Sequence, residues 1–373
     1  MTRVLVLGAG VSAPAGYPPT VNLLESIGQE AGRSNFFQLS NAWDIWCKYL
    51  ENLPPELEFL RAAQNPELIL SFTDLLDVAA SEEDHRRTVE AVSHLKKTGQ
   101  ADPASLENYF TSPGRGLVSN ARQGKAQLLE ALTWYFAFRH MDDRKAPQSS
   151  RDYLRQLLNP LERGDAVLTF NWDTLAERTL AEDGRWSPLN GYGFTRQLTR
   201  DLGPEGRVPI PNGRLPLSDI VILKLHGSFG WRAAEKGMYL DAENFLRGFE
   251  WPNSGDLVAL HDAAEPEHYS PTNPVVAYPS YLKRLSCPPL DLTWRTAASY
   301  LERAQYVEIV GYSLPTSDAA ARSLFLPLAE HVRGGRVRVV VRDQSSNTLE
   351  HWGELLGPRA ELREETNKST GSS

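Results

Sequence analysis

Five short apolar runs, each followed by glycine or polar residues, constrain the fold of this chain more than any other feature. Runs rich in valine, isoleucine and leucine are typical of strands that are buried on both faces of a parallel sheet. Helical patterns separate the runs, and no hairpin signal joins any two of them. We therefore predict an α/β fold built on a Rossmann-like, doubly wound parallel sheet. The predicted strands cover residues 3–7, 166–170, 220–225, 306–311 and 336–341, with a shorter one at 274–279.

The region between the first two strands has a different character. Residues 30–149 contain few β-branched runs and several amphipathic stretches, of which 125–141 is the richest in apolar residues. We predict that residues 30–149 form a helical insertion in a discontinuous Rossmann-type domain, which consists of residues 1–29 and 150–360. Residues 361–373 are predicted to form a disordered tail.

Helices and irregular segments alternate with the later strands. Residues 184–219 are rich in glycine and proline and are interpreted as a loop, and residues 232–274 are interpreted as an irregular excursion. Amphipathic patterns predict the helices of this part of the chain at residues 150–158, 174–181, 292–304, 319–331 and 348–356.

Composition argues against several classes of protein. The formal net charge of -8 is unlike that of a nucleic-acid-binding protein, which usually presents a basic face. No apolar run reaches the roughly 18 residues of a membrane span, and the first residues have the pattern of a strand and not of a signal peptide. The two cysteines, Cys47 and Cys287, cannot form a four-cysteine zinc module. We therefore expect a cytoplasmic protein with no metal site, no membrane contact and no direct contact to nucleic acid.

Glycine and hydroxyl residues follow two of the predicted strands. The first strand runs into Gly8-Ala9-Gly10-Val11-Ser12, where glycine would let the backbone approach a pyrophosphate. The match to a dinucleotide fingerprint is partial, because the third glycine position holds alanine, and a plain tight turn is the alternative. The strand at 306–311 ends in Gly311, and Ser313 could donate to a phosphate. The alternative there is a helix start, with Ser317 or Asp318 as the cap.

Polar side chains follow the other three strands. Asn171 and Asp173 could hold a ribose hydroxyl, a water or a carboxamide, or they could simply cap the next helix. His226, followed by Gly227, could act as a general base near neutral pH, or it could be a structural histidine. Asp343 could bind an adenosine ribose or could be a solvated loop acid. Because the carboxyl ends of parallel strands meet at one edge, we expect these groups to form a nucleotide site there.

Taken in order, these segments resemble the motifs of the Sir2 (sirtuin-like) superfamily. The glycine-rich start resembles its Gly-Ala-Gly-x-Ser cofactor loop, and the residues around Asn171 resemble its Thr-Gln-Asn-x-Asp segment. Residues 224–227, Lys-Leu-His-Gly, resemble its catalytic Leu-His-Gly, and residues 311–314, Gly-Tyr-Ser-Leu, resemble its phosphate loop. The resemblance covers residues 1–28 and about 150–345, and it leaves the helical region unexplained.

The chain also departs from the protein deacylases of that superfamily. It lacks the four-cysteine zinc ribbon, it has Phe170 where they have glutamine, and it replaces their Gly-x-Pro-Asp-Phe-Arg extension with Gly-Tyr-Pro-Pro-Thr at 16–20. The variants present here are similar to the prokaryotic Sir2-like group, whose best-known members consume NAD⁺ as effectors of antiphage defence.

The resemblance implies an NAD⁺ glycohydrolase that releases nicotinamide and ADP-ribose, without zinc. It implies that Asn171 positions the ribose or the water, that His226 contacts ribose hydroxyls and acts as general base, and that Asp173 holds the carboxamide. An NAD-dependent deacylase or ADP-ribosyltransferase, and a sensor that binds NAD⁺ or ADP-ribose without turnover, are the alternatives. Because unrestrained NAD⁺ cleavage would harm its host, we expect control by homo-oligomerisation or by a regulatory partner protein. The resemblance also implies that phosphates bind to Gly8, Gly10, Ser12 and Ser313 and that the adenosine ribose binds to Asp343. Ala9, Gly227 and Gly311 are further predicted contacts to the cofactor.

Overall fold

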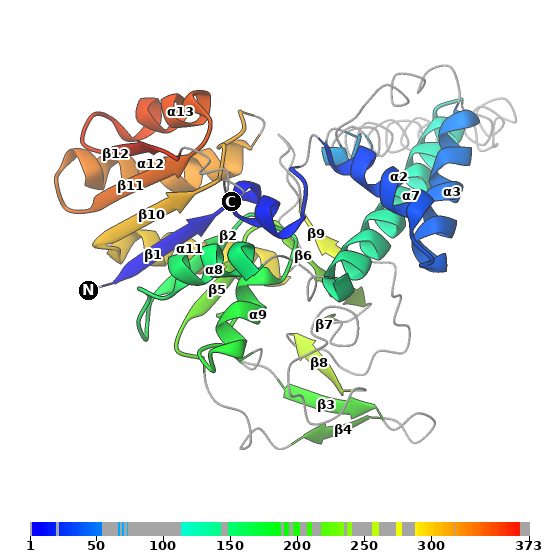
Figure 1. Ribbon diagram of the computed structural model, residues 1–373, viewed down its shortest axis with the longest axis horizontal. Coiled ribbons are helices and arrows are strands. Elements are labelled where there is room, and N and C mark those ends of the chain that lie inside the picture. Colours follow the sequence, from blue (N-terminus) through cyan, green and yellow to red (C-terminus); the bar gives the residue numbers. More distant parts are fainter. Residues whose placement is uncertain are drawn as a thin grey trace, which may run out of the picture. The chain divides into compact units, whose positions relative to one another are not determined.

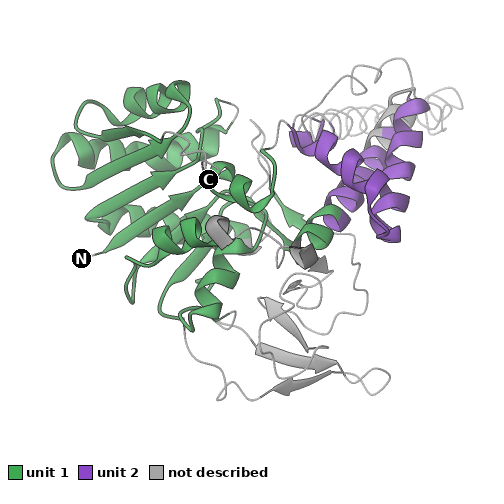
Figure 2. Cartoon of the chain, viewed as in Figure 1, with its two compact units in different colours: residues 1–19, 135–373 green, residues 20–134 purple. Residues whose placement is uncertain are grey.

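The computed structural model describes most of the chain and divides it into two compact units. Unit 1 contains residues 1–19 and 135–373, and unit 2 contains residues 20–134 (Figure 2). The domain boundaries expected at residues 29/30 and 149/150 remain predictions. The described residues are 2–19, 22–53, 66–67, 69–70, 73, 113–142, 148–187, 190–193, 197–201, 207–210, 218–234, 237–240, 256–260, 274–277, 288–316 and 318–365.

A six-stranded parallel sheet forms the centre of unit 1 (Figure 1). Its strand order is β12-β11-β10-β1-β2-β5, and every neighbouring pair is parallel. This confirms the predicted α/β, Rossmann-like fold. The strands are β1 (Arg3–Leu7), β2 (Ala166–Thr169), β5 (Val221–Lys224), β10 (Tyr306–Val310), β11 (Arg338–Asp343) and β12 (Glu361–Glu364).

The order of the strands reverses at β1. The chain proceeds outward from β1 to β2 and β5, then returns to the other side of β1 and proceeds outward again through β10 and β11. Leu7, the last residue of β1, is aligned with Thr169 on one side and with Val310 on the other. In open α/β sheets, ligands bind outside the carboxyl ends of the strands at such a switch point.

Apolar side chains cover both faces of this sheet. Val4 and Val6 of β1 belong to a buried cluster that includes Phe325 and Trp352 from two of the helices. Successive strand residues point to opposite faces, so the equally buried Leu5 faces the other side of the sheet. Burial on both faces explains why these strands read as continuous apolar runs. The helices of unit 1 are α1 (Ala9–Ser12), α8 (Gln148–Leu158), α9 (Leu175–Glu182), α11 (Pro288–Arg303), α12 (Ala319–Arg333) and α13 (Ser346–Leu356), with a 3-10 turn at Ala13–Ala15.

A second sheet in unit 1 corrects the sequence analysis. Its order is β4-β3-β8-β7-β6-β9, and its pairs are antiparallel. It occupies parts of the segments interpreted as a loop (184–219) and as irregular (232–274). One of its strands, β9, lies within the short strand predicted at 274–279. The others lack the apolar runs of the first sheet and were not predicted as strands. The strands of this second sheet are β3 (Gln197–Asp201), β4 (Arg207–Ile210), β6 (Gly227–Ala234), β7 (Gly237–Leu240), β8 (Asp256–Leu260) and β9 (Pro274–Val276).

The carboxyl-terminal segment also differs from its prediction. Residues 361–364 form β12, which pairs with β11 over Val340–Asp343, although a disordered tail was expected to begin there. Because β12 is at the sheet edge and its side chains are mostly exposed, it lacks the apolar pattern of a buried strand. Residues 366–373 lie outside the described residues.

The described part of unit 2 is helical. It contains α2 (Leu23–Arg33), α3 (Phe37–Glu51) and most of α7 (Pro113–Asp142), whose residues from 135 onward belong to unit 1. Trp46 stacks on Tyr49 within α3, with 5.4 Å between the ring centroids. Much of the expected helical insertion lies outside the described residues. None of the helices described in either unit combines the length and apolar character needed to cross a membrane.

Candidate functional site

All the residues singled out from the sequence follow strands of the parallel sheet, at its carboxyl edge. The structure joins most of them into two groups of contacts. One group links the loop after β1 to the loops after β2 and β10, and the other links the loop after β5 to the start of α12. The residues concerned are Gly8, Ala9, Gly10 and Ser12 after β1, Asn171 and Asp173 after β2, His226 and Gly227 after β5, Gly311 and Ser313 after β10, and Asp343 at the end of β11.

The glycines after β1 and β10 pack directly against each other. Gly8 N donates to Val310 O at 3.0 Å, and Gly10 N donates to Gly311 O at 3.1 Å. A Cβ on Gly311 would lie 2.9 Å from Gly10 Cα, and Gly311 also has a φ of 64°. Glycine is therefore needed here for the close approach of two backbones. The amides of Gly8 and Gly10 serve this contact, and the predicted contact of this loop with phosphates stays a prediction.

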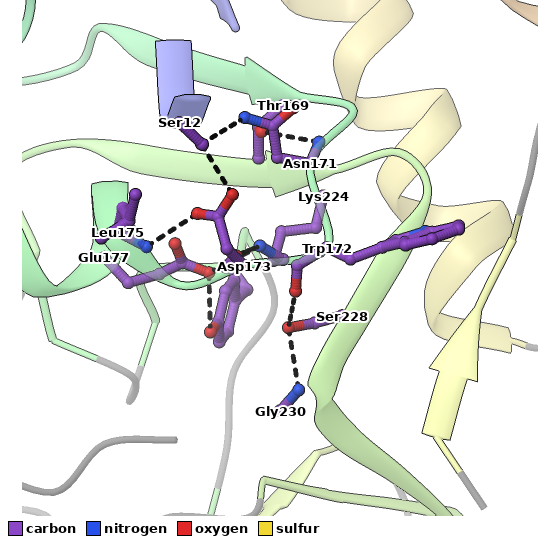
Figure 3. Close-up of polar contacts among 11 residues, drawn as sticks. Ser12, Thr169, Asn171, Trp172, Asp173, Leu175, Glu177, Lys224, Ser228 and Gly230 are labelled. Carbon is purple, nitrogen blue, oxygen red and sulfur yellow. Dashed lines mark hydrogen bonds and ion pairs between the residues drawn. The ribbon is translucent and has the colours of Figure 1, made fainter. Parts of the chain in front are cut away.

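Ser12 connects the loop after β1 to the loop after β2 by side chains (Figure 3). Asn171 Nδ2 donates to Ser12 Oγ and to Gly8 O, both at 2.9 Å, and Ser12 Oγ donates to Asp173 Oδ2 at 2.7 Å. The amide nitrogen of Asn171 is thus fixed by two acceptors. Asn171 Oδ1 is buried and has no hydrogen-bond partner among the described residues. A buried acceptor in this state is costly for the protein alone, and it can receive a hydrogen bond from a ligand.

Asp173 shapes the turn that carries Asn171. Its Oδ2 accepts the Ser12 hydroxyl, and its Oδ1 accepts from Leu175 N at 3.0 Å at the start of α9. Asp173 therefore binds the first amide of α9, although the N-cap residue of that helix is Thr174. Since both carboxylate oxygens already accept hydrogen bonds within the protein, the contact of Asp173 with a carboxamide stays a prediction.

An ion pair lies beneath this turn (Figure 3). Lys224 Nζ is 3.0 Å from Glu177 Oε1, and both side chains have 0% exposure. Lys224 Nζ also donates to the main-chain oxygen of Asp173, and Tyr192 OH donates to Glu177 Oε1 at 3.2 Å. Burial raises the pKa of the Glu177 carboxyl, and the nearby Lys224 ammonium acts in the opposite direction.

The side chain of His226 contacts a carboxylate from the segment between β10 and α12, which lies on the other side of β1. Its Nε2 is 2.8 Å from Asp318 Oδ2, and the residue is only 2% exposed. Because a carboxylate accepts but does not donate, this contact places the ring proton on Nε2. Tyr312 OH donates to the same Asp318 oxygen at 3.3 Å, while Asp318 Oδ1 accepts from Ala321 N at 3.0 Å. Asp318 thus caps α12, as one interpretation of the sequence expected, and also orients His226.

Aromatic rings surround this pair. Phe170 stacks on Tyr312, with 3.8 Å between centroids and 3° between planes, and meets the His226 ring edge-on at 5.0 Å. Phe170 is therefore part of the packing around His226.

The remaining predicted residues lie at the edge without joining these contacts. Gly227 has a φ of 71°, and a Cβ there would collide with Val275 O, so a turn and a close approach both require glycine. Ser313 is exposed, and the buried Leu314 after it has a φ of 49°, a costly conformation for a branched residue. Asp343 Oδ1 accepts from Ser345 N at 2.8 Å, and burial raises the pKa of its carboxyl.

Two features of the site were not identified from the sequence. The partnership of His226 with Asp318 joins residues 92 positions apart, and only the sheet order brings them together. Lys224 and Glu177 carried a weak signal, since a lysine inside an apolar run and a glutamate on a helix facing the sheet both imply buried charge. Among the described residues, no group of three or more His, Cys, Asp or Glu side chains could hold a metal ion.

Comparison with models of known protein families finds no match, and comparison with curated proteins finds none either.

Proposed function

We propose that this protein is an NAD⁺ glycohydrolase, which hydrolyses NAD⁺ to nicotinamide and ADP-ribose. The observation that carries the proposal is the pair of side chains that follow the neighbouring strands β2 and β5. Thr169 and Lys224 are aligned in the sheet, and Asn171 and His226 each lie two residues beyond them. One side chain offers a buried acceptor and the other an oriented imidazole, beside the switch point where such sheets bind nucleotides.

The reaction requires little covalent chemistry from the protein. Nicotinamide leaves with the electron pair of the bond to the anomeric carbon of the ribose, and positive charge develops on that carbon. Water then adds to the carbon and loses one proton, so the products are nicotinamide, ADP-ribose and H⁺. The site must therefore orient the ribose, place a water and receive a proton.

Each group has a property that fits one of these tasks. Asn171 Oδ1 would accept a hydrogen bond from a ribose hydroxyl or from the attacking water without adding charge. His226 would contact ribose hydroxyls and take up the proton at Nδ1, because its Nε2 proton is directed at Asp318. The Asp318 carboxylate would stabilise the imidazolium that results. Gly8, Gly10, Ser12 and Ser313 remain the predicted contacts to phosphates.

The test is turnover by the purified full-length chain. Incubation with NAD⁺, followed by chromatography, is expected to show equal amounts of nicotinamide and ADP-ribose. The variants Asn171→Ala, His226→Ala and Asp318→Asn should each lower kcat by about 10²–10⁴-fold, the range of general acid–base catalysis. His351→Ala on α13 is the matched control and should retain full activity. Wild-type rates in both Asn171→Ala and His226→Ala would overturn the proposal.

The alternatives from the sequence analysis are separate outcomes of the same assay. NAD⁺ consumption that depends on an acyl-lysine peptide, or that labels a protein with ADP-ribose, would indicate a deacylase or a transferase. Saturable NAD⁺ binding with no product would indicate a sensor.

We extend the proposal to antiphage defence, on the strength of the motif resemblance alone. Depletion of NAD⁺ would stop the metabolism of an infected cell, and control by self-association or by a partner protein would prevent it in uninfected cells. Cells expressing the wild-type chain should survive phage challenge as a population better than cells expressing His226→Ala.

A further inference from the structure

The buried ion pair of Lys224 and Glu177 has no part in the chemistry proposed above. Lys224 is the last residue of β5, and Glu177 lies in the first turn of α9. Both side chains have 0% exposure, and Glu177 Oε2 is buried without a hydrogen-bond partner among the described residues. Such a pair contributes little net stability, because removing two charges from water costs about as much as their attraction returns. Well-packed apolar residues of similar volume stabilise a fold equally well or better.

An apolar pair could not supply the directional contact that Lys224 makes. Its ammonium donates to the main-chain oxygen of Asp173, two residues after Asn171 (Figure 3). Glu177 and, through it, Tyr192 fix the position of that ammonium. The carboxylate of Asp173 in turn receives the Ser12 hydroxyl, which accepts the amide of Asn171. Lys224 is therefore connected to Asn171 through Asp173, whose main chain accepts from Lys224 and whose carboxylate accepts from Ser12.

Other contacts hold the same turn on its remaining sides. Asn171 N donates to Thr169 Oγ1 at 3.1 Å. The carbonyl of Trp172 accepts from Phe229 N at 3.2 Å and from Ser228 Oγ at 3.3 Å. The Asp173 carbonyl differs from these groups because its hydrogen-bond donor is a buried charge, the ammonium of Lys224.

We propose that Lys224, oriented by Glu177, is a positioning residue that sets the turn carrying Asn171 and so aims Asn171 Oδ1 at the substrate. The proposal rests on the proposed function, because it assigns the purpose of this geometry to NAD⁺ cleavage. Its structural part, the placement of the turn by Lys224, can be tested without any activity.

The decisive variant is the double substitution Lys224→Met/Glu177→Met. Methionine is unbranched, has about the length of either side chain and adapts to irregular packing, so the core stays filled and neither charge is left alone. The double variant removes the donor to the Asp173 carbonyl and the acceptor of the Tyr192 hydroxyl, so it is expected to unfold at a somewhat lower urea concentration than the wild type. The single variant Lys224→Met leaves the Glu177 carboxylate buried without its counter-ion and should unfold at a lower concentration still.

Activity should fall much more than stability in the double variant. In the double variant kcat should fall on the order of 100-fold, because small displacements of an orienting group have effects of that size. KM should change less than about threefold, since the lost interaction matters most in the transition state. The control is Arg342→Met/Glu308→Met, which removes a 2.7 Å ion pair between β11 and β10 that does not touch the turn. It should retain wild-type kcat.

A crystal structure of the double variant completes the test. We expect the Asp173 carbonyl to move and the Asn171 amide to leave Gly8 O and Ser12 Oγ. A stable double variant with wild-type kcat and an unmoved turn would overturn the positioning role while leaving the NAD⁺ glycohydrolase proposal standing. A wild-type chain that does not cleave NAD⁺, together with a displaced turn in the variant, would overturn the function and retain the structural role of Lys224.

Discussion

The loop after β1 contacts its two neighbours by different means. Toward β10 the contact is made by main chain, with Gly8 and Gly10 packed on Gly311 and no side chain between them. Toward β2 it is made by side chains, through the hydrogen bonds of Ser12 with Asn171 and Asp173. The two contacts lie on opposite sides of the switch point of one sheet.

The main-chain contact toward β10 stabilises the fold, whereas the side-chain contacts toward β2 set the geometry of the candidate site. Backbone packing tolerates no added atom, so changes on the β10 side should cost stability. Hydrogen bonds between side chains can be removed while the fold remains, so substitutions on the β2 side should displace the side chain of Asn171.

The largest effect is expected from Gly8→Ala. Its Cβ would lie 2.6 Å from Tyr312 Cβ and closer still to the main chain of Gly311, and neither neighbour can move without shifting β10. We expect a loss of about 3 kcal/mol or more in the free energy of unfolding, at the upper end of the cost of overpacking. Urea denaturation measures it as a lower midpoint at an unchanged slope.

Gly32→Ala in α2 is the matched control for this substitution. A Cβ at Gly32 would have no atom within 4 Å, and alanine is a better helix former than glycine. The free energy of unfolding should therefore rise by up to about 1 kcal/mol. If Gly8→Ala were as stable as Gly32→Ala, the main-chain contact would not be essential to the fold.

An intermediate effect is expected from Ser12→Ala. The substitution leaves Asp173 Oδ2 without its donor and Asn171 Nδ2 with Gly8 O as its acceptor. We expect a loss of about 1–3 kcal/mol of stability, together with a fall in kcat for NAD⁺ that is larger than the change in KM. Denaturation and steady-state kinetics on the same preparation measure both.

Ser40→Ala is the control for Ser12. It removes one hydroxyl bond to Ala31 O within unit 2 and should lower stability by about 1 kcal/mol with no change in kcat. Equal kinetic losses in the two serine variants would contradict the assignment of the β2 side to the site.

The smallest effect concerns the edge of the sheet, where β11 and β12 are joined by exposed charges. Hydrogen bonds from Arg338 and Arg363 lower the pKa of Glu361 from 4.5 to about 2. A lowered carboxyl pKa means that the folded state holds the ionised form more strongly. This contribution to stability is therefore complete above pH 4.5 and is lost as the pH falls toward 2.

Thermal unfolding of wild type and Glu361→Gln across this pH range tests the assignment. The difference in Tm should be small, because Glu361 is exposed and solvent screens its ion pairs. The difference in Tm between wild type and Glu361→Gln should disappear near pH 2. A difference that grows as the pH falls would contradict the lowered pKa of Glu361.

The sequence predicted the parts of the molecule whose pattern is set by burial on both faces of a sheet. The runs predicted at 3–7, 166–170, 220–225 and 306–311 contain the strands β1, β2, β5 and β10 of the parallel sheet, and the polar residues after them lie at its carboxyl edge as expected. Of the second sheet only β9 was predicted as a strand, because the other strands lack such runs. β12 was missed for a similar reason, since an edge strand needs no apolar alternation.

Contacts between side chains from different strands and helices could not be predicted from the sequence. His226 and Asp318 are brought together by the order of the strands and not by spacing along the chain. Lys224 was visible within an apolar run, but its partner could not be chosen among the acidic residues without the position of α9. The individual strand ends were therefore predictable, whereas the side chains that hold them in place were not.

The pairing of β1 with β10 also has a consequence for the newly made chain. Residue 3 is aligned with residue 306, so the central strand lacks one neighbour until most of the protein has been synthesised. Contacts between residues so distant in sequence form slowly. Asp318, which orients His226, is translated later still. A nascent chain would thus carry Asn171 and His226 long before Asp318 could orient His226, so under the proposed function NAD⁺ cleavage would not begin on the ribosome.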